Sequence, residues 1–103
     1  NGNEFPKNQY TKWFDYDKIK GTLSLRHRQP GDYLTLPSGG RKTLKSWMID
    51  EKIPRQEREE IWLLAEEKHI LWIVGHRISA YYKITEQTKT ILEVEFNGGK
   101  SSG

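Results

Sequence analysis

The order of apolar and polar residues predicts short β-strands over most of the chain. Several segments of about four to eight residues alternate between apolar and polar side chains or collect β-branched and aromatic residues, as strands do. The run 70–74 (ILWIV) is apolar on both faces, which is typical of a central strand. The strands predicted in this way cover residues 10–16, 22–28, 33–36, 61–65, 69–74 and 88–96.

The segment 22–28 shows the clearest period of two. Leu23 and Leu25 fall on one side of the predicted strand, and Arg26 and Arg28 fall on the other. Because successive side chains of a strand point to opposite faces, we expect one buried face and one solvated, basic face.

The middle of the chain changes to a helical period. Leu44, Trp47 and Met48 are spaced i, i+3 and i+4, which predicts one apolar stripe on a helix over residues 44–51. Thr43 precedes this stripe and is a suitable N-cap, because its hydroxyl can accept a bond from a free backbone N–H.

Pro54 ends that helix and opens a second one over residues 54–60, since proline is tolerated at a first helical position. The second helix is rich in arginine, so pairing within the helix accounts for its carboxylates. These carboxylates are Glu57, Glu59 and Glu60.

Two glycine-containing connections lie between the predicted elements. Pro30-Gly31 suits the centre of a type II turn, because proline presets the first dihedral angle and glycine accepts a positive φ. Residues 38–40 (SGG) match neither a phosphate loop nor an ATP-pyrophosphatase loop, because Arg41 interrupts the first motif and Lys42-Thr43 replace Asp-Ser in the second. This loop is either a plain glycine connection or a backbone amide nest for an RNA phosphate.

Together these elements predict an α+β domain of about six strands with two short helices inserted in the middle. The 103 residues are enough for one small domain, expected over residues 10–96. The polar segments 1–9 and 97–103 are expected to be a disordered or linker N-terminus and a disordered tail.

Composition excludes several functions. The chain has no cysteine, so it has no disulfide and no thiolate metal site, which fits a cytoplasmic protein. No apolar run approaches the roughly 20 residues of a membrane helix, so no membrane partner is expected. The three histidines lie in separate segments without paired spacing, and no nucleophile motif occurs, so no metal and no catalytic residue is predicted.

The basic residues suggest a partner. The chain carries 17 Lys and Arg against 14 Asp and Glu, for a net charge of +3, and eight of the 17 cations lie between Arg26 and Arg58. Scattered cations on a solvated face would explain the composition alone, but clustering at loops and helix starts favours an RNA backbone. The candidate contacts are Arg26, Arg28, Arg41, Lys42, Lys45, Arg55, Arg58 and Arg77. We expect them to line a single ridge, with Asp32 orienting a neighbouring arginine.

The 12 aromatic residues offer a second means of contact, because bases stack on aromatic rings. Trp47 lies in the helical apolar stripe and Trp72 lies in the apolar run 70–74, so both are assigned to the core. For Trp13 and Trp62, both a core role and a surface role remain open.

Five segments resemble the C-terminal domain of bacterial tRNA(Ile)-lysidine synthases, over about residues 13–95. They are 14–18 (FDYDK), 26–32 (RHRQPGD), 40–45 (GRKTLK), 53–58 (IPRQER) and 71–79 (LWIVGHRIS). Two positions depart from the family pattern. Tyr33 stands where an arginine is common, which removes one cation, and Trp62 stands where a proline often precedes the paired leucines.

The resemblance implies a small β-sandwich with helices, similar to a module of the phenylalanyl-tRNA synthetase β subunit. In the family, an N-terminal domain uses ATP and lysine to convert the wobble cytidine of a tRNA(Ile) to lysidine. The C-terminal domain is expected to bind the tRNA acceptor stem without catalysing the reaction and without a cofactor of its own. Other partners would be the remaining domains of the same enzyme and, through the full-length enzyme, a second copy. The alternative is a docking module that only positions other domains or subunits.

Overall fold

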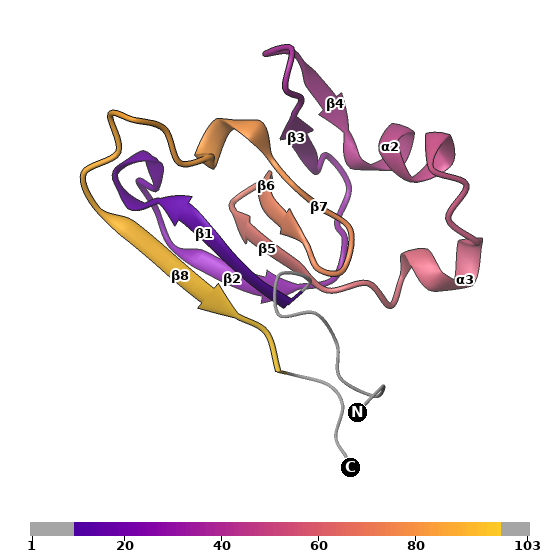
Figure 1. Cartoon of the computed structure of the whole chain (residues 1–103). Helices are drawn as coiled ribbons and strands as arrows, with labels where there is room; N and C mark the ends of the chain where they lie inside the picture. Colours follow the sequence, from indigo (N-terminus) through magenta and orange to yellow (C-terminus); the bar gives the residue numbers. More distant parts are fainter. Residues whose placement is uncertain (1–9, 98–103) are drawn as a thin grey trace, which may run out of the picture.

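The computed structural model describes residues 10–97, so the expectations for residues 1–9 and 98–103 lie outside the described part of the chain. The described residues form eight short strands in two sheets, two α-helices and two 3-10 turns (Figure 1). The predicted α+β class is therefore confirmed. Within residues 10–97 no helix has the length and apolar character needed to cross a membrane.

The smaller sheet joins the two ends of the described chain. Strand β1 (Thr11–Asp15) pairs antiparallel with β8 (Ile91–Glu95), with Trp13 opposite Glu93. The 3-10 turn η1 (Tyr16–Lys18) follows β1 directly. Figure 1 shows this sheet on the side of the molecule opposite the α-helices.

The larger sheet contains the other six strands. They are β2 (Leu23–Arg26), β3 (Tyr33–Thr35), β4 (Arg41–Thr43), β5 (Leu63–Glu66), β6 (His69–Ile73) and β7 (Arg77–Ile78). The strand order is β2-β5-β6-β3-β4, and β7 also pairs with β6. The β3–β6 pair is parallel and the other pairs are antiparallel. The predicted hairpin of β5 and β6 and the central place of β6 are thus confirmed.

Strand β6 is apolar on both faces because it lies between two core clusters. Ile70 and Ile73 belong to a cluster that also contains Leu34 of β3 and the buried residues of the first α-helix. Leu71 and Trp72 belong to a second cluster beneath the small sheet, with Phe14 and Tyr82. The register with β5 shifts at Leu71, a β-bulge that interrupts the strict alternation and lets the neighbours Leu71 and Trp72 join the same cluster. One strand thus supplies apolar side chains to both clusters.

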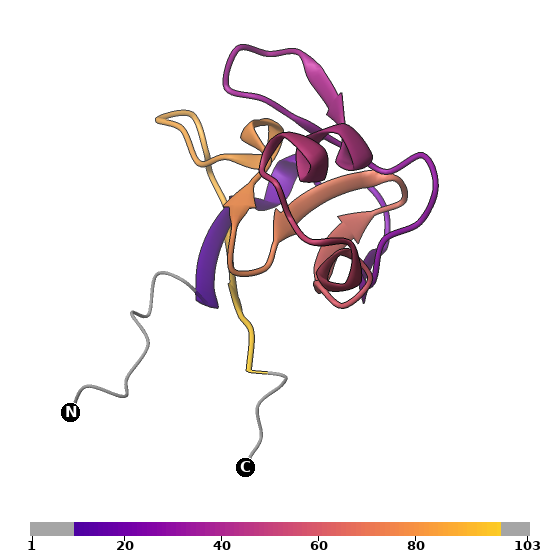
Figure 2. The ribbon, with the colours of Figure 1, turned by 90° about the vertical axis from the view of Figure 1, so that its right-hand side faces the viewer.

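The helices follow the order that the sequence predicts. Helix α2 (Leu44–Asp50) begins after Thr43, whose hydroxyl accepts a hydrogen bond from the Ser46 N–H at 3.1 Å. Its stripe of Leu44, Trp47 and Met48 is buried against the larger sheet. Helix α3 (Arg55–Arg58) is one turn long, which is shorter than the predicted 54–60. Figure 2 shows both helices on the side of the molecule that faces the viewer, with α3 below α2.

The predicted faces of segment 22–28 are wrong. Leu25 is 50% exposed, whereas the side chain of Arg26 keeps only 16% of its accessible surface. The strand lies at the edge of the larger sheet, and a buried carboxylate from the next turn attracts Arg26 inward. Tertiary pairing here overrides the apolar alternation.

Two strands were absent from the sequence-based prediction. Arg41 and Lys42, expected on a loop and helix start, lie on β4 as the second strand of a hairpin with β3. The loop 38–40 is the turn of this hairpin, closed by a 2.8 Å bond from the Leu36 N–H to the Gly40 carbonyl. Strand β7 spans only two residues and exists through its pairing with β6.

Candidate nucleic-acid interface

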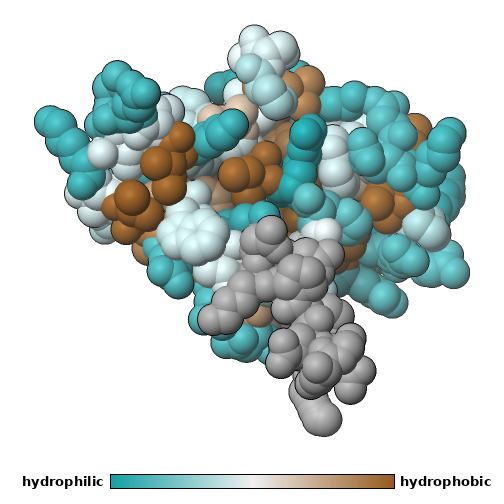
Figure 3. Space-filling model, in the orientation of Figure 1, coloured by the Kyte–Doolittle hydropathy of each residue, from teal (hydrophilic) through white to brown (hydrophobic). Residues whose placement is uncertain are grey.

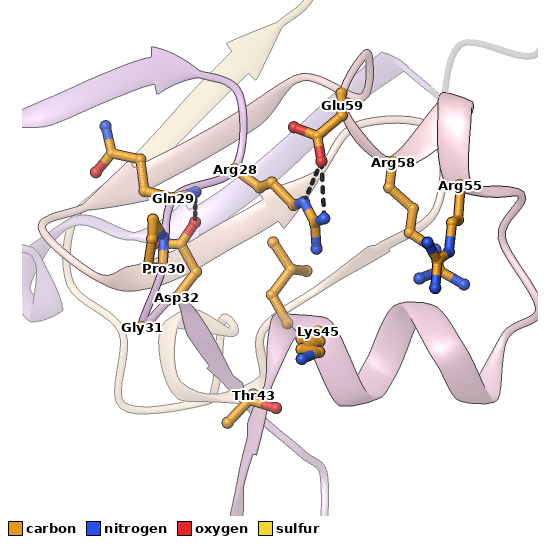
Figure 4. A pocket seen from close by; sticks show the side chains of 11 residues that line it. Arg28, Gln29, Pro30, Gly31, Asp32, Thr43, Lys45, Arg55, Arg58 and Glu59 are labelled. Atoms are coloured by element: carbon orange, nitrogen blue, oxygen red, sulfur yellow. Dashed lines mark hydrogen bonds and ion pairs between the residues drawn. The ribbon is translucent and has the colours of Figure 1, made fainter.

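A basic hollow opens between the β2–β3 connection, the start of α2 and helix α3 (Figure 4). Its volume is about 820 Å³. Four of the eight candidate cations line it, namely Arg28, Lys45, Arg55 and Arg58. Figure 3 shows the surface over the two helices as largely hydrophilic. We call this site the helix-side hollow.

A type II turn positions one wall of the hollow. The Asp32 N–H donates to the Gln29 carbonyl at 3.3 Å, and Gly31 between them has a φ of +89°. The Asp32 carboxylate in turn accepts a bond from the Gln29 N–H at 2.8 Å. The predicted turn is confirmed, and glycine is needed because other residues rarely adopt this φ.

Asp32 also fixes Arg26. The carboxylate side chain is fully buried, and it accepts two hydrogen bonds from the Arg26 guanidinium at 2.9 and 3.0 Å. The same guanidinium donates to the backbone carbonyls of His27 and Glu67. The expectation that Asp32 orients an arginine is therefore met by Arg26. Since these bonds occupy both terminal nitrogens of Arg26, its role in the structure is to hold the turn and the strand together.

Arg28 extends from the end of β2 across the hollow toward α3. Its Nε donates to a Glu59 carboxylate oxygen at 2.8 Å, and a terminal nitrogen lies 2.7 Å from the same oxygen. This bond corrects the expectation that the Glu59 carboxylate pairs within its helix, because its partner comes from 31 residues away. The pair holds the Arg28 guanidinium over the opening, and one terminal nitrogen makes no bond within the described residues.

Helix α3 presents Arg55 and Arg58 one turn apart, and Figure 4 shows both turned toward the hollow. The Nε of Arg58 donates to the Ile53 carbonyl at 2.8 Å, and within residues 10–97 its two terminal nitrogens make no hydrogen bond. Within residues 10–97, no carboxylate forms an ion pair with Lys45, Arg55 or Arg58. Three cations around one concave surface are thus available for an anionic ligand, and an arginine fork suits phosphate.

The structure does not bring all eight candidates to this hollow. Arg26 is held by Asp32, and Lys42 of β4 forms an ion pair with Asp50 at the end of α2. Arg77 lies half-buried on β7, opposite Ile73. Arg41 lines a second, separate hollow together with Tyr33 and His69. The expected single ridge therefore reduces to four cations at one site.

The second hollow is lined by residues of the β3–β4 hairpin, of β6 and of the segment 80–82, and has a volume of about 480 Å³. We call it the aromatic hollow, because four of the residues that line it have aromatic rings, namely Tyr33, His69, Tyr81 and Tyr82. Arg41 and seven further residues complete the lining. The His69 ring stacks on Tyr33 with centroids 4.5 Å apart, and it contacts Tyr81 and Tyr82 at 5.2 and 4.9 Å. The Arg41 guanidinium lies over the Tyr33 ring at 4.4 Å.

Hydrogen bonds fix the floor of the aromatic hollow. His69 Nε2 lies 3.0 Å from the Thr35 hydroxyl and 3.4 Å from the Ser79 hydroxyl. The Tyr82 hydroxyl donates to Glu66 at 2.8 Å, and the other oxygen of that carboxylate accepts the backbone N–H groups of Lys20 and Gly21.

Two pKa shifts follow from these bonds. Burial opposes ionisation of Glu66, but the bonds from Tyr82 and the two amides outweigh it and lower the pKa of that carboxyl. Burial, followed by the bond to Glu66, raises the pKa of Tyr82 far above its ordinary value. Glu66 is thus held as a carboxylate and Tyr82 as a neutral donor.

No pattern in the sequence indicated that these residues lie together. Tyr33, His69 and Tyr81 come from β3, β6 and the 3-10 turn η2 (Ala80–Tyr82), which are far apart in the chain. Only the general expectation that aromatic residues can stack bases pointed toward such a site. Among the described residues, no group of three or more histidine or carboxylate side chains is placed to hold a metal ion.

The His69 environment predicts a pH dependence of stability. Burial first, and then the charge of Arg41, lower the pKa of His69, while Glu66 raises it less. In the unfolded chain, His69 therefore binds a proton near pH 6.5, whereas in the folded domain the ring binds that proton only at a lower pH. Stability should be full above about pH 6.5 and should fall as the pH drops through the lower pKa of the folded state.

Urea unfolding between pH 5 and pH 8 measures this effect. His69→Gln should flatten the decline, because Gln keeps a polar group near Thr35 without titrating. His27→Gln is the matched control and should keep the decline. A decline of equal size in both variants would contradict the assignment to His69.

The mixed sheet, the helices at one edge and the basic hollow define a small α+β domain that presents free cations on a concave surface. The crystal structure described as the TilS C-terminal domain has this fold, with a TM-score of 0.65 and 26% sequence identity over 92% of this chain and 79% of that chain. The family model of the TilS substrate C-terminal domain matches residues 23–95. The chain belongs to this family.

Curated relatives agree with this assignment. The tRNA(Ile)-lysidine synthase of Caldanaerobacter subterraneus is 46% identical over 94 residues, covering 90% of this chain and 20% of the relative. The tRNA(Ile)-lysidine synthase of Clostridium tetani is 41% identical over 97 residues, covering 93% and 21%. The chain thus spans about a fifth of the length of the curated relatives it matches.

Proposed function

We propose that this domain binds the acceptor stem of a tRNA(Ile) and helps a tRNA(Ile)-lysidine synthase select its substrate, without taking part in the chemistry. The observation that carries the proposal is the helix-side hollow, where Lys45, Arg55 and Arg58 have no carboxylate partner within residues 10–97. A cation that is already paired with a carboxylate contributes little to the binding of a phosphate. These three cations have no such partner and can replace the counterions of an RNA backbone.

Duplex RNA suits the shape of this site. An A-form stem presents phosphates and 2′-hydroxyls across a shallow minor groove, and proteins contact it mainly by shape. The cations come from a turn, a helix start and a second helix, so their relative positions are fixed by the backbone. Arg28 and Arg58 are further fixed by the Glu59 carboxylate and the Ile53 carbonyl. Rigid donors lose little entropy on binding.

A salt series with a hairpin RNA that carries the acceptor-stem sequence of a tRNA(Ile) tests the proposal. Three or four phosphate contacts predict that log K falls against log salt with a slope of roughly −2 to −4. A hairpin with scrambled stem pairs separates selection by sequence from binding by shape. An absence of hairpin binding at low salt would contradict the proposal.

A docking role for the domain has one observation in its favour. Apolar side chains reach the surface away from the helix-side hollow, and Trp13, Leu25 and Trp62 are 42%, 50% and 37% exposed. If the chain fails to bind the hairpin but binds the remaining domains of a tRNA(Ile)-lysidine synthase tightly, docking replaces RNA binding as the function.

A further inference from the structure

From the aromatic hollow, we infer a second RNA site in this domain, which holds one unpaired nucleotide next to the duplex in the helix-side hollow. The base would stack against the exposed parts of Tyr81 and Arg41, where Lys18 Nζ lies 5.2 Å from the centroid of the Tyr81 ring, and its phosphate would lie among the surrounding lysines. The inference rests on the proposed function, because the duplex is what brings the unpaired nucleotide to the site.

The lining of the aromatic hollow has the chemistry that a nucleotide needs. Tyr81 is 43% exposed, and the Arg41 guanidinium covers the Tyr33 ring while remaining at the surface. Unpaired bases stack on tyrosine rings and on arginine guanidinium planes. A volume of about 480 Å³ lies within the range of small-ligand sites.

The charge of the hollow favours an anion. Four cations line it, namely Lys18, Lys20, Arg41 and Lys68. Within residues 10–97, none of the four forms an ion pair with a carboxylate. Two carboxylates, Glu66 and Glu67, also line it, but both oxygens of Glu66 already accept hydrogen bonds from Tyr82 and the backbone. The remaining net charge is positive, so a phosphate is attracted.

The ring cluster is rigid before any ligand arrives. His69 is fixed by two hydroxyls and lies against three tyrosine rings, and Ser79 also accepts the Tyr81 N–H at 3.4 Å. Because the pKa of His69 is lowered by burial and by Arg41, the ring is neutral and adds no repulsion to these cations. A preformed stacking surface needs little ordering on binding.

The two hollows adjoin, which argues for a nucleotide of the same RNA rather than a free mononucleotide. Gly31 lines the helix-side hollow, and a Cβ built on it would lie 3.7 Å from Cε of Lys68, which lines the aromatic hollow. The Tyr33 N–H donates to the Lys68 carbonyl at 3.0 Å at the same boundary. One continuous strand can therefore pass from the first site to the second across Gly31 and Lys68.

The test compares a blunt RNA hairpin with the same hairpin extended by unpaired 3′ nucleotides, each titrated with the 103-residue chain. The extension should tighten binding roughly 5- to 150-fold, which corresponds to the 1–3 kcal/mol typical of stacking one base on an aromatic side chain. Tyr81→Ala and Arg41→Ala should remove most of this gain and leave blunt-hairpin binding unchanged. Trp13→Ala, at a similarly exposed aromatic residue on β1, should keep it.

A fluorescent base separates stacking from charge. With 2-aminopurine in the extension, binding should quench the fluorescence for the unaltered chain and leave it unquenched for Tyr81→Ala. An abasic extension, which keeps the phosphates, should lose most of the gain. CMP or AMP alone should bind far more weakly than the extended hairpin, and equally tight binding would overturn the placement of the site on the RNA strand.

Binding of the blunt hairpin tests the proposed function independently of the second site. If it binds and the extension adds nothing, the second site is overturned while duplex binding stands. If Tyr81→Ala weakens both hairpins equally, the second site is also overturned. If neither hairpin binds, the proposed function fails and the inference fails with it.

Discussion

Arg26→Ala is expected to destabilise the domain by about 3–5 kcal/mol, the cost of removing one partner from a buried ion pair. Asp32 would be left with a fully buried carboxylate that keeps only the Gln29 N–H as a donor. The bonds from Arg26 to the His27 and Glu67 carbonyls would also be lost. Since small domains have total stabilities of about 5–15 kcal/mol, denaturant unfolding should show a large shift of the midpoint.

A double-mutant cycle provides the control. Arg26→Ala with Asp32→Ala should cost less than the sum of the single changes, because no buried charge remains unpaired. Arg41→Ala, at an exposed cation without a carboxylate partner, should change stability by less than about 1 kcal/mol. If Arg26→Ala unfolds at the same denaturant concentration as the unaltered chain and loses RNA binding instead, Arg26 is a contact and not a structural residue.

The triple variant Lys45→Ala, Arg55→Ala, Arg58→Ala is expected to reduce the salt slope of hairpin binding by about 2–3 units, because each lost phosphate contact removes about 0.7–0.9. Affinity should fall at every stem sequence to a similar extent, since phosphates are common to all of them. Hairpin titrations at several salt concentrations measure both quantities.

A matched variant removes the same charge elsewhere. Lys12, Lys83 and Lys89 line neither hollow, and Lys12 belongs to β1, opposite the α-helices in Figure 1. Their joint replacement by alanine should leave the slope within about one unit of the original. Equal losses in the two triple variants would show that net charge, and not the helix-side hollow, drives binding. Unfolding curves of both variants check that the fold is kept.

Local features of this fold were predictable because they depend on residues close together in the chain. The type II turn at Pro30-Gly31, the Thr43 cap and the buried stripe of Leu44 and Trp47 each involve a contact within four residues. The apolar run of β6 predicted its central place, since a strand that is apolar on both faces has to be covered on both.

The sequence-based predictions failed where a residue far away in the chain determines the burial of a side chain or the formation of a strand. Leu25 is exposed and Arg26 is drawn inward, because β2 is an edge strand beside the buried Asp32 carboxylate. Arg41 and Lys42 form a strand because β3 offers them an open edge. Apolar periodicity contains no information about either neighbour.

The candidate cations show the same division. Composition and motifs alone show that cations are clustered between residues 26 and 58. They also show the resemblance to the C-terminal domain of tRNA(Ile)-lysidine synthases. Only the tertiary structure decided which cations are free, by pairing Arg26 with Asp32, Lys42 with Asp50 and Arg28 with Glu59. It also decided that Tyr33, His69 and Tyr81 form one stacked cluster. The reason is physical: turns and helix caps are set by neighbours in sequence, whereas the availability of a charge or a ring depends on which distant groups the fold places beside it.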